Sequence, residues 1–280
     1  MGTPKIRLTK EKETYLATLY GKALDAAVEN PILGDKYAAD AIAHIDYDFK
    51  KLKVPNGGDI TLPMRAWHFD QWTGAFIAAN PECTVLHLGC GLDTRVQRID
   101  PAAQVRWYDV DFPDVIELRK QLYPDRVGYH LIGSSVTDLA WLDAIPGDMP
   151  VIVVAEGLVM YLHEKDGTVL FRRITEQFPS GQIAFDGYSG SMVRLVSRLA
   201  TVRGAKVELV WGMDDPHDLE KHIPQLHLVE SVEFLMMPEL LSRLPTTGFR
   251  GAMYKVMGKF SFYRHLVRHL RYEFAGKTAD

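Results

Sequence analysis

Cysteine is scarce in this sequence. Its 280 residues include two cysteines, Cys83 and Cys90, and two cannot form the framework of a disulfide-stabilised domain. Their spacing does not match that of zinc sites, so we expect no bound metal. We predict that both are reduced core or loop residues of a cytoplasmic protein.

The sequence also lacks an apolar run long enough to cross a membrane. The longest, MPVIVVAEGLVMYL, is interrupted by Glu156, whereas a spanning helix needs about 20 apolar residues. The charged N-terminus has no apolar core of a signal peptide. Gly2 is followed by Ile6 where a myristoylation motif has Ser or Thr. We therefore predict no membrane partner.

No large excess of either charge is present. The chain has 32 Lys and Arg against 36 Asp and Glu, with a net charge of −4, so we expect no nucleic-acid partner. Internal repeats are absent, and nothing in the sequence indicates an oligomeric state. The length fits one large α/β domain with elaborations, or two small domains. The expected partner is a small-molecule substrate.

The first third of the chain is predicted to be helical. The pattern from residue 13 to 45 is interrupted at Pro31 and Gly34. Residues 56–63 read as a loop, and a second helix over residues 64–79 ends before Pro81.

After residue 80, short apolar runs alternate with amphipathic stretches. This alternation predicts a parallel sheet with helices on both faces. The expected strands span residues 84–89, 105–111, 127–133, 150–156 and 181–188, and the expected helices span residues 94–99, 113–124, 137–146 and 164–179.

The rhythm changes again after residue 188. Residues 189–230 read as helices and loops over the carboxyl edge of the sheet, in the position of a lid. A strand at 228–235, a helix at 237–245, a strand at 252–260 and a last strand after it would close the sheet with an antiparallel hairpin.

The first predicted strand ends in Gly89-Cys90-Gly91. Doubly wound sheets bind ligands beyond the carboxyl ends of their strands, and glycine lets a ligand approach the backbone closely. The dinucleotide fingerprint would have a third glycine where Thr94 stands, which weakens a pyrophosphate interpretation. The alternative is a strand-to-helix turn that binds nothing.

Two acids, Asp109 and Asp111, end the second strand, and Asp111 follows Gly91 by twenty residues. A carboxylate at this place can accept both ribose hydroxyls of an adenosine. The alternative is a strand-end turn or a helix N-cap ahead of Pro113. Together, the glycine loop and the acid favour a nucleoside-bearing cofactor.

Four motifs carry a family resemblance. VLHLGCGLDTR, WYDVDFPDVIELRK, SSVTDLAWL and VVAEGLVMYL, in this order and spacing, resemble the leucine carboxyl methyltransferase family, in particular its bacterial polyketide-type (tetracenomycin-type) O-methyltransferases. The resemblance covers residues 15 to 275. It implies a class I S-adenosylmethionine-dependent methyltransferase fold, Rossmann-like, with a mostly parallel seven-stranded sheet, an antiparallel C-terminal hairpin, an N-terminal helical cover and a lid insertion. S-adenosylmethionine carries no phosphate, so a looser glycine loop suffices for it.

One methyltransferase domain over residues 1–280 follows from this resemblance. Its expected parts are a helical cover at 1–80, a cofactor-binding core at 81–188, a lid at 189–231, and C-terminal strands and a helix at 232–280 that complete the sheet.

The resemblance also implies the cofactor site. Gly89 and Gly91 face the methionine part, and Asp111 holds the ribose. Glu156 faces the amino end, and Arg65 and Lys22 reach the carboxylate. Ser135 and Val136 border the adenine, where the eukaryotic members have Asp-Leu. The full set of expected cofactor-binding residues is Lys22, Arg65, Gly89, Cys90, Gly91, Asp93, Asp109, Asp111, Phe112, Ser135, Val136, Glu156 and Gly157.

Charge burial supports two of these roles independently. Glu156 follows an apolar strand, where a carboxylate is costly unless a cation such as an ammonium or sulfonium lies near it. The alternative is a structural ion pair with an arginine. Arg65 could bind a carboxylate through two hydrogen bonds, or form a surface salt bridge.

The acceptor atom depends on the presence of a base. A carboxylate arrives ionised, whereas a phenol with a pKa of about 10 usually needs a base. His163 and Tyr161 are the candidates, and His163 could equally cap a helix. No base stands out, so we expect transfer to a carboxylate of a small organic acid or polyketide-like metabolite, with phenolic O-methylation as the alternative. The expected substrate-binding residues are Tyr161, Tyr188, Met192 and Trp211, each of which could equally belong to the core.

Two other groups of residues were considered, for attracting an anionic substrate and for binding a metal. Arg194, Arg198 and Arg203 could attract an anionic substrate or form a solvated helix face. His217 and His222 have poor helical spacing for a metal.

Two other functional classes share the glycine loop and the acid. One is an NAD-dependent oxidoreductase, which Thr94 and the loop position of Tyr161 and Lys165 disfavour. The other is a non-catalytic protein that binds an adenosine cofactor.

Overall fold

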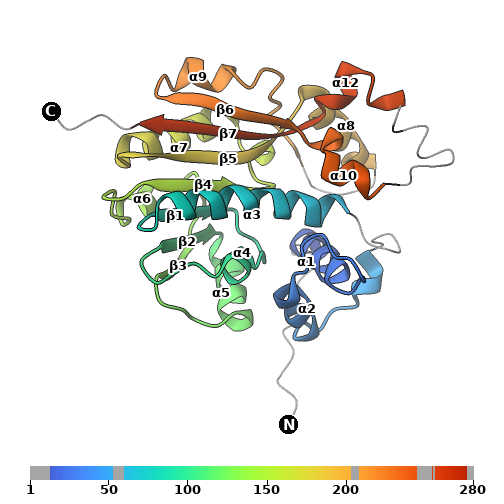
Figure 1. The fold of residues 1–280 in the computed structure, drawn as a ribbon, viewed down its shortest axis with the longest axis horizontal. Coiled ribbons are helices and arrows are strands. Elements are labelled where there is room, and N and C mark those ends of the chain that lie inside the picture. The colour runs from blue at the N-terminus through green and yellow to red at the C-terminus, as the bar shows by residue number, and fades with distance from the viewer. Residues whose placement is uncertain (1–12, 53–59, 203–207, 245–253, 255, 276–280) are drawn as a thin grey trace, which may run out of the picture.

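A seven-stranded sheet with the strand order β3-β2-β1-β4-β5-β7-β6 forms the centre of the molecule. The computed structural model describes residues 13–52, 60–202, 208–244, 254 and 256–275 (Figure 1). The first five strands of the chain pair in parallel, and β7 lies antiparallel between β5 and β6. The strands are β1 (Thr84–Leu88), β2 (Arg106–Asp111), β3 (Tyr129–Gly133), β4 (Val151–Ala155), β5 (Ser180–Tyr188), β6 (Leu226–Glu233) and β7 (Val267–Ala275).

This architecture confirms the predicted fold class, including the antiparallel C-terminal hairpin. The central strands β1 and β4 are buried at every position. Continuous apolar runs such as TVLHL and VIVVA form such strands because helices cover both of their faces.

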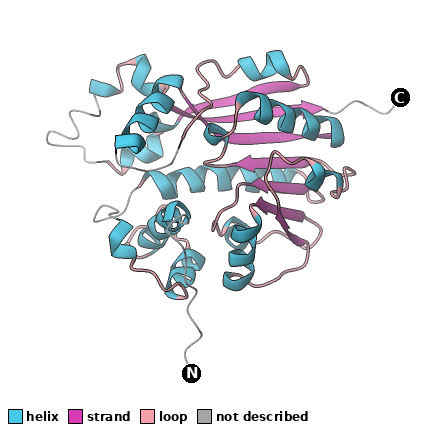
Figure 2. Cartoon of the chain, turned by 180° about the vertical axis from the view of Figure 1, so that it is seen from behind, coloured by secondary structure: helices cyan, strands magenta, loops and turns pink. Residues whose placement is uncertain are grey.

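Helices cover both faces of the sheet (Figures 1 and 2). They are α1 (Glu13–Ala26), α2 (Lys36–Ala43), η2 (Phe49–Leu52), α3 (Thr61–Ala79), α4 (Arg95–Ile99), α5 (Pro113–Leu122), α6 (Ala140–Asp143), η3 (Val159–Tyr161), α7 (Glu164–Gln177), α8 (Gly190–Val202), α9 (Asp218–His222), η4 (Phe234–Met236), α10 (Pro238–Ser242) and α12 (Ser261–Arg264).

The long helix α3 crosses one face of the sheet (Figure 1). Its Phe69, Trp72 and Phe76 pack against β1, β2 and β4. His68 contacts β7, where its Nδ1 lies 2.7 Å from Nδ1 of His269. Burial of this aromatic stripe fixes α3 on the sheet, and the N-terminal turn of α3 then brings Arg65 to the carboxyl ends of β4 and β5.

The opposite face carries α6 and α7. Phe171 and Ile174 of α7 join a large apolar cluster with the residues of β4 and β5 that point to this side. Trp211 belongs to the same cluster and is 7% exposed. Its ring occupies the space above Gly167 of α7, where a Cβ would lie 2.2 Å from the indole.

The N-terminal helices α1 and α2 pack on each other beside the loop that follows β1. Leu16 and Leu19 of α1 share an apolar cluster with Leu92 of that loop and Leu118 of α5. Residues 13–43 therefore cover the carboxyl end of β1.

Three sequence-based boundaries were wrong. Helix α3 begins at Thr61, within the expected loop, whose residues 56–59 lie outside the described part of the chain. β6 begins at Leu226, so its first residues belong to the sheet and not to the lid expected at 189–231.

The expected strand at 252–260 is the third error. Its described residues Tyr254, Val256 and Met257 are helical. Short apolar runs fit a helical turn as well as a strand, and periodicity alone does not separate the two.

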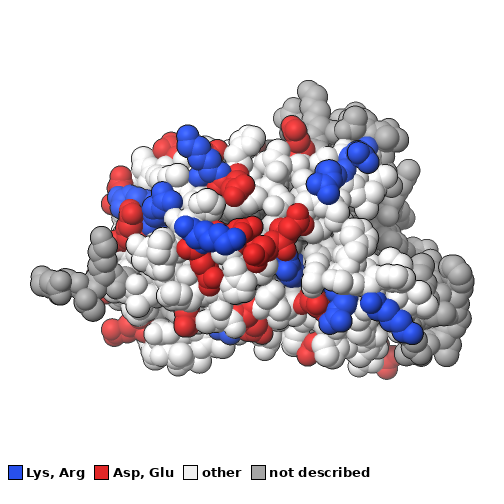
Figure 3. All heavy atoms as spheres, turned by 90° about the horizontal axis from the view of Figure 1, so that it is seen from above, with Lys and Arg blue, Asp and Glu red and all other residues white. Residues whose placement is uncertain are grey.

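Charged side chains of both signs mix on the face seen in Figure 3, where Lys and Arg lie beside Asp and Glu. Among the described residues, no helix has the length and apolar character needed to cross a bilayer. The same part of the chain contains no cluster of His, Cys, Asp and Glu suited to a metal ion.

Candidate functional site

The loop between β1 and α4 lies where the strand order reverses, because β2 and β4 flank β1 on opposite sides. Such a switch point is the usual ligand site of an open α/β sheet. Gly91 has φ 50°, and a Cβ on it would lie 3.0 Å from the Tyr15 ring of α1. Glycine is needed here for both reasons, and the result is a stretch of bare backbone under α1.

Asp111 at the end of β2 holds this loop. Its Oδ2 accepts from the Gly91 N–H at 2.7 Å, and its Oδ1 accepts from the Phe112 N–H at 2.7 Å. A carboxylate has about four acceptor positions, so two remain for a ligand. Burial raises the pKa of Asp111, against the effect of the two backbone N–H donors. Phe112 beside it is 53% exposed.

Asp109 is different, although it also was expected to bind the cofactor. It is fully buried and accepts hydrogen bonds from His87, Trp107 and Tyr129 at 2.9, 2.8 and 2.6 Å. It also pairs with Arg119. Burial raises its pKa, and Arg119 and His87 more than offset this, so the pKa is about 2. Protein donors surround Asp109, which corrects the expectation that it contacts a ligand.

Arg119 connects Asp109 to the glycine loop. Its Nη1 donates to the carbonyl oxygens of Gly91 at 2.9 Å and Asp93 at 2.7 Å. Arg119, held in place by its ion pair with Asp109, therefore fixes the positions of these two loop carbonyl groups. We infer that Asp109 supports the site through Arg119 without touching the ligand.

A buried network of charges lies between the glycine loop, α1, α3 and β4. Its cations and carboxylates are each at most 15% exposed. The cations are Lys22, Arg65, Arg95 and Arg98, and the carboxylates are Asp35, Asp70, Asp93, Glu156 and Asp186. The carboxylates outnumber the cations by one, so one more positive charge would balance the network.

Glu156 lies at the centre of this network, directly after β4. Its Oε1 accepts from Arg65 Nε at 2.9 Å, its Oε2 accepts from Arg95 Nη2 at 2.5 Å, and Lys22 Nζ lies 4.0 Å away. Burial alone would raise its pKa, but Lys22, Arg65 and Arg95 hold the pKa well below the usual range. The carboxylate is therefore ionised. The surrounding cations offset the cost of burying its charge at the end of an apolar strand.

Lys22 and Asp93, two of the expected cofactor-binding residues, pair with each other in this network. Lys22 Nζ lies 2.6 Å from Asp93 Oδ2 and is 1% exposed. Burial raises the pKa of Asp93, and Arg98, Lys22 and Arg95 lower it further than burial raises it. α1 is thus tied to the glycine loop by a buried ion pair.

Asp186 of β5 is a site residue that the sequence reasoning missed. Its Oδ1 accepts from the Gly157 N–H at 2.6 Å, and its Oδ2 accepts from Arg65 Nη1 at 3.2 Å. Gly157 has φ 67°, and a Cβ on it would lie 3.2 Å from the Arg65 guanidinium. The signal was available, since Asp186 lies near the end of the apolar run in GQIAFDGY, much as Glu156 directly follows the apolar run in PVIVVAE.

Arg95 and Arg98 were missed as well. Both lie on α4, directly after the glycine loop, and Arg95 is fully buried. Arg98 bridges Asp35, Asp70 and Asp93. Their spacing of three residues in DTRVQR puts both on one helix face, which is the signal that could have found them.

Two phenols lie near Arg65 and Asp186. Tyr188 ends β5, and Tyr161 follows β4 with 43% of its surface exposed. Burial and then the Asp186 charge raise the pKa of Tyr188 to about 12. Burial also raises the pKa of Tyr161. Both phenols are therefore protonated near neutral pH.

The other predicted site residues lie farther from this centre. Val136 is buried in the main apolar cluster, and the Ser135 hydroxyl lies 2.9 Å from that of Thr137. His163 is the exposed N-cap residue of α7. Trp211 lies in the core, which corrects its assignment to a substrate pocket.

Three further predictions concern α8 and the glycine loop. Met192 of α8 and Tyr188 both pack against the apolar cluster that contains Met64 and Phe234. Cys90 is 2% exposed. Arg203 lies outside the described residues.

These features fit S-adenosylmethionine, the cofactor that the sequence resemblance implies. The cofactor carries a sulfonium, an ammonium and a carboxylate, hence one net positive charge, which matches the extra carboxylate of the network. The remaining acceptor positions of Asp111 suit ribose hydroxyls.

Several known proteins are similar to this chain in sequence. The family model "Leucine carboxyl methyltransferase" matches residues 11–128. The tetracenomycin polyketide synthesis O-methyltransferase of Streptomyces glaucescens is 40% identical over 264 residues, which are 94% of this chain and 98% of that protein. An S-adenosyl-L-methionine-dependent methyltransferase of Gibberella zeae is 35% identical over 79% of this chain and 82% of its own length.

Two solved structures share the fold. A DUF574 family protein from Streptomyces avermitilis superposes with a TM-score of 0.53 at 18% identity, covering 76% of this chain and 85% of that one. A complex of the Haloferax volcanii Trm112 methyltransferase activator with a methyltransferase gives a TM-score of 0.50 at 15% identity, covering 77% and 92%.

The sheet order, the glycine loop and these relatives define an S-adenosylmethionine-dependent methyltransferase of class I. More specifically, the chain belongs to the leucine carboxyl methyltransferase family, in its bacterial polyketide-type branch. The NAD-dependent and non-catalytic alternatives are thereby set aside.

Proposed function

We propose that this enzyme methylates a carboxylate of a small aromatic acid and forms a methyl ester. The polyketide O-methyltransferase of Streptomyces glaucescens, 40% identical to this chain, supports a polyketide-like acceptor. The charges at the ends of β4 and β5 support a carboxyl group as the acceptor.

The residues that would hold the cofactor follow from the network. Asp111 would accept from the ribose hydroxyls, and the backbone of Gly89 and Gly91 would lie along the methionine chain. Glu156 would pair with the ammonium, and Arg65, with its guanidinium already at the site, would pair with the carboxylate. When bound, the cofactor supplies a methyl group that is activated by its sulfonium.

The observation that carries the carboxylate assignment is the state of the titratable groups at these strand ends. Glu156 is held ionised by arginines and lysine, and the pKa values of Tyr161 and Tyr188 are raised. His163 is exposed at the N-terminus of α7. Glu156, held by its ion pairs, and the two protonated phenols are therefore unsuited to remove a proton near neutral pH. An acceptor that arrives ionised needs no such base.

The protein's part in the reaction is then positioning and exclusion of water. The acceptor's carboxylate oxygen would take the methyl group that the cofactor supplies, with the sulfur as leaving group, and the protein would have no proton to move. Alignment of two reactants can contribute about 7–11 kcal/mol. Two segments cover the strand ends. One is α1, which the Lys22–Asp93 ion pair holds in place. The other is the segment around Leu209, which packs on Met160 and forms backbone hydrogen bonds to the Met160 carbonyl oxygen.

Phenolic O-methylation is the second candidate, and one observation favours it. Asp186 is buried beside Tyr188, and burial raises its pKa. A carboxylate with a raised pKa is a better acceptor for a phenolic proton. In that case Asp186 would act as the base.

A pH profile with paired probes tests the proposal. Purified enzyme is given S-adenosylmethionine with naphthalene-2-carboxylate or with 2-naphthol, and methylated product is measured from about pH 6 to about pH 9. Carboxyl methylation predicts ester formation from the acid with kcat/KM nearly independent of pH. Ether formation from the naphthol alone, rising with pH and lost in Asp186→Asn, would replace the proposal by the second candidate.

A further inference from the structure

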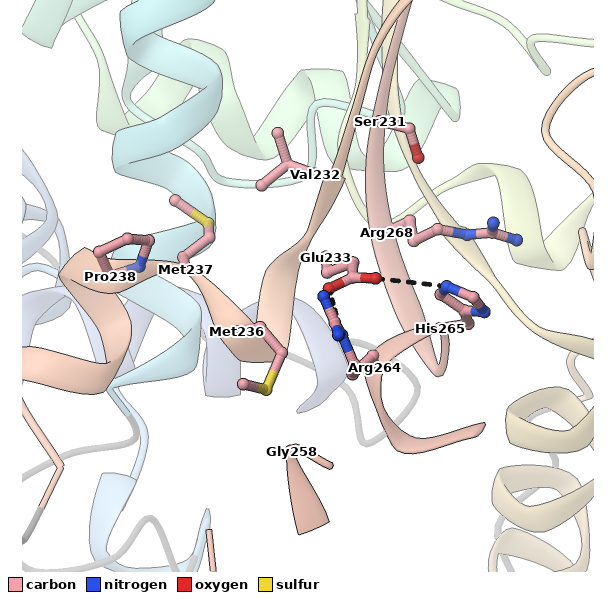
Figure 4. A pocket seen from close by; sticks show the side chains of 10 residues that line it. All are labelled: Ser231, Val232, Glu233, Met236, Met237, Pro238, Gly258, Arg264, His265 and Arg268. Atoms are coloured by element: carbon pink, nitrogen blue, oxygen red, sulfur yellow. Dashed lines mark hydrogen bonds and ion pairs between the residues drawn. The ribbon is translucent and has the colours of Figure 1, made fainter. Parts of the chain in front are cut away.

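The cavity at the ends of β6 and β7 lies apart from the site at Glu156 and Asp111 (Figure 4). It measures about 480 Å³, and none of its lining residues belongs to the glycine loop or to the charge network. Its carboxylate, Glu233, already pairs with Arg264 Nε at 2.7 Å and lies 3.3 Å from His265 Nε2. The glycine loop is covered from another side, by α1.

Tyr15 of α1 lies directly over this loop. A Cβ on Gly91 would lie 3.0 Å from Cδ1 and 3.6 Å from Cε1 of Tyr15, so the edge of the ring lies against the loop backbone. Leu16 and Leu19 of the same helix are buried in an apolar cluster with Leu92, whereas Tyr15 is only half-buried. Its side chain therefore keeps open surface at the carboxyl end of β1.

The groups that act on the Tyr15 hydroxyl show that it lies across the end of β1. Burial and the nearby carboxylate of Asp111 raise the pKa of Tyr15 to about 12, and Tyr161 also contributes. Asp111 ends β2 and Tyr161 follows β4, and β1 lies between these two strands in the sheet. Tyr15 therefore lies between Asp111 and Tyr161, and its phenol is uncharged near neutral pH.

Helix geometry puts Lys22 on the same face of α1 as Tyr15. The two residues are seven positions apart, which is close to two full turns and about 10 Å along the helix axis. Lys22 Nζ lies 2.6 Å from Asp93 and 4.0 Å from Glu156. One face of α1 therefore reaches from the Glu156 end of the site to its Asp111 end.

The cofactor has its sulfonium between the two groups that these acids would bind, because the sulfur joins the methionine chain to the ribose. With the ammonium at Glu156 and the ribose hydroxyls at Asp111, the sulfonium would lie over the end of β1, which Tyr15 covers. An aromatic ring attracts a nearby cation through the negative charge of its face. This attraction is absent once the methyl group has left and the sulfur is a neutral thioether.

We propose that Tyr15 is a further cofactor-contacting residue, whose ring lies against the sulfonium and favours the charged donor over the neutral product S-adenosylhomocysteine. The preference helps the spent cofactor to leave the site under α1 after each methyl transfer. This inference rests on the proposed placement of the cofactor at Asp111 and Glu156. It does not depend on which atom of the acceptor is methylated.

Calorimetric titration with two matched ligands tests this role without an acceptor. S-adenosylmethionine and S-adenosylhomocysteine differ by one methyl group and one charge, and each is titrated into the full-length wild type, Tyr15→Phe and Tyr15→Leu. We expect the wild type to bind S-adenosylmethionine more tightly. Tyr15→Leu should reduce this preference, the ratio of the two dissociation constants, by about threefold or more, as loss of a cation–π contact would. Tyr15→Phe keeps the ring and should keep the preference.

Tyr20→Leu is the matched control. Tyr20 lies five residues from Tyr15 and therefore on another side of α1, where its ring packs on Phe49 with centroids 5.2 Å apart. The variant removes an aromatic ring from the same helix and should leave the preference unchanged. Both dissociation constants come from one preparation of each variant, so partial unfolding would change the binding stoichiometry and leave their ratio intact.

Each result decides the role of Tyr15. Absence of a preference in the wild type, or an unchanged preference in Tyr15→Leu, overturns it, and so does an equal loss of preference in Tyr15→Phe or Tyr20→Leu. Ester formation from naphthalene-2-carboxylate by the wild type reports separately on the proposed function. Absence of the ester, together with a preference that depends on the Tyr15 ring, would reject carboxyl methylation and support the role of Tyr15.

Discussion

Asparagine substitutions at Asp111 and Asp109 should have opposite effects on cofactor binding and stability. The two acids stand two residues apart on β2, but Asp111 has acceptor positions left at the glycine loop, whereas Asp109 is surrounded by protein donors. We expect Asp111→Asn mainly to weaken cofactor binding and Asp109→Asn mainly to destabilise the fold.

The expected magnitudes follow from these contacts. Hydrogen bonds to a charged acceptor contribute about 1.5–3 kcal/mol and neutral ones about 0.5–1.5 kcal/mol, so loss of the Asp111 charge should weaken binding by about 1–3 kcal/mol, or about 5- to 150-fold. Asp109→Asn leaves the fully buried Arg119 without its counter-charge. Breaking a buried ion pair costs about 3–5 kcal/mol of folding stability.

Two measurements check this pair of variants. Titration calorimetry with S-adenosylhomocysteine gives the affinity, and urea unfolding of the free proteins gives the free energy of unfolding. Asp109→Asn should show a smaller loss of affinity, transmitted through Arg119 and the loop carbonyls. If Asp109→Asn weakened binding more than Asp111→Asn with no loss of stability, the roles assigned to the two acids would be refuted.

Three further predictions test the charge network and the core. Arg65→Lys loses the fork that joins Glu156 to Asp186, so the KM for S-adenosylmethionine should rise about tenfold or more in steady-state assays, and an unchanged KM would contradict the role of Arg65. The pKa of Glu156 is lower in the folded than in the unfolded chain, so its stabilisation is present above the unfolded pKa of about 4.3 and is lost as the pH falls. Urea unfolding between about pH 3 and about pH 7 should therefore show stability rising with pH, with a shallower rise in Glu156→Gln. Equal slopes for the two proteins would argue against the ion pairs around Glu156. Trp211→Ala should cost about 3–5 kcal/mol of unfolding free energy while the KM for the acceptor stays unchanged, whereas a raised KM at intact stability would return Trp211 to the substrate pocket.

The positions of the central strands and of the glycine loop could be predicted from the sequence. Runs such as TVLHL and VIVVA are apolar at every position because both faces of a central parallel strand are covered. The glycines of the first loop and the acid after β4 follow from the same local pattern, because bare backbone and a buried charge at a strand end are unusual. The family motifs then added Lys22 and Arg65, which no local pattern singles out.

The tertiary structure alone decided between residues that look alike in the sequence. Asp109 and Asp111 lie on the same side of β2 by its period of two, and only the packing of Arg119 and Tyr129 under the sheet shows that the first is enclosed. Trp211 was assigned to the pocket from its position in the chain, and its contact with Gly167 puts it in the core.

Strand pairing likewise brought distant residues together. Asp186 meets Arg65 across 121 positions of the chain, and Arg268 meets Glu233 and Gly187 through the register of β7. A local pattern in the sequence reports burial and secondary structure because these depend on neighbouring residues. The partners of a buried charge depend on which strands and helices pack side by side, and for this protein only the folded chain determines that.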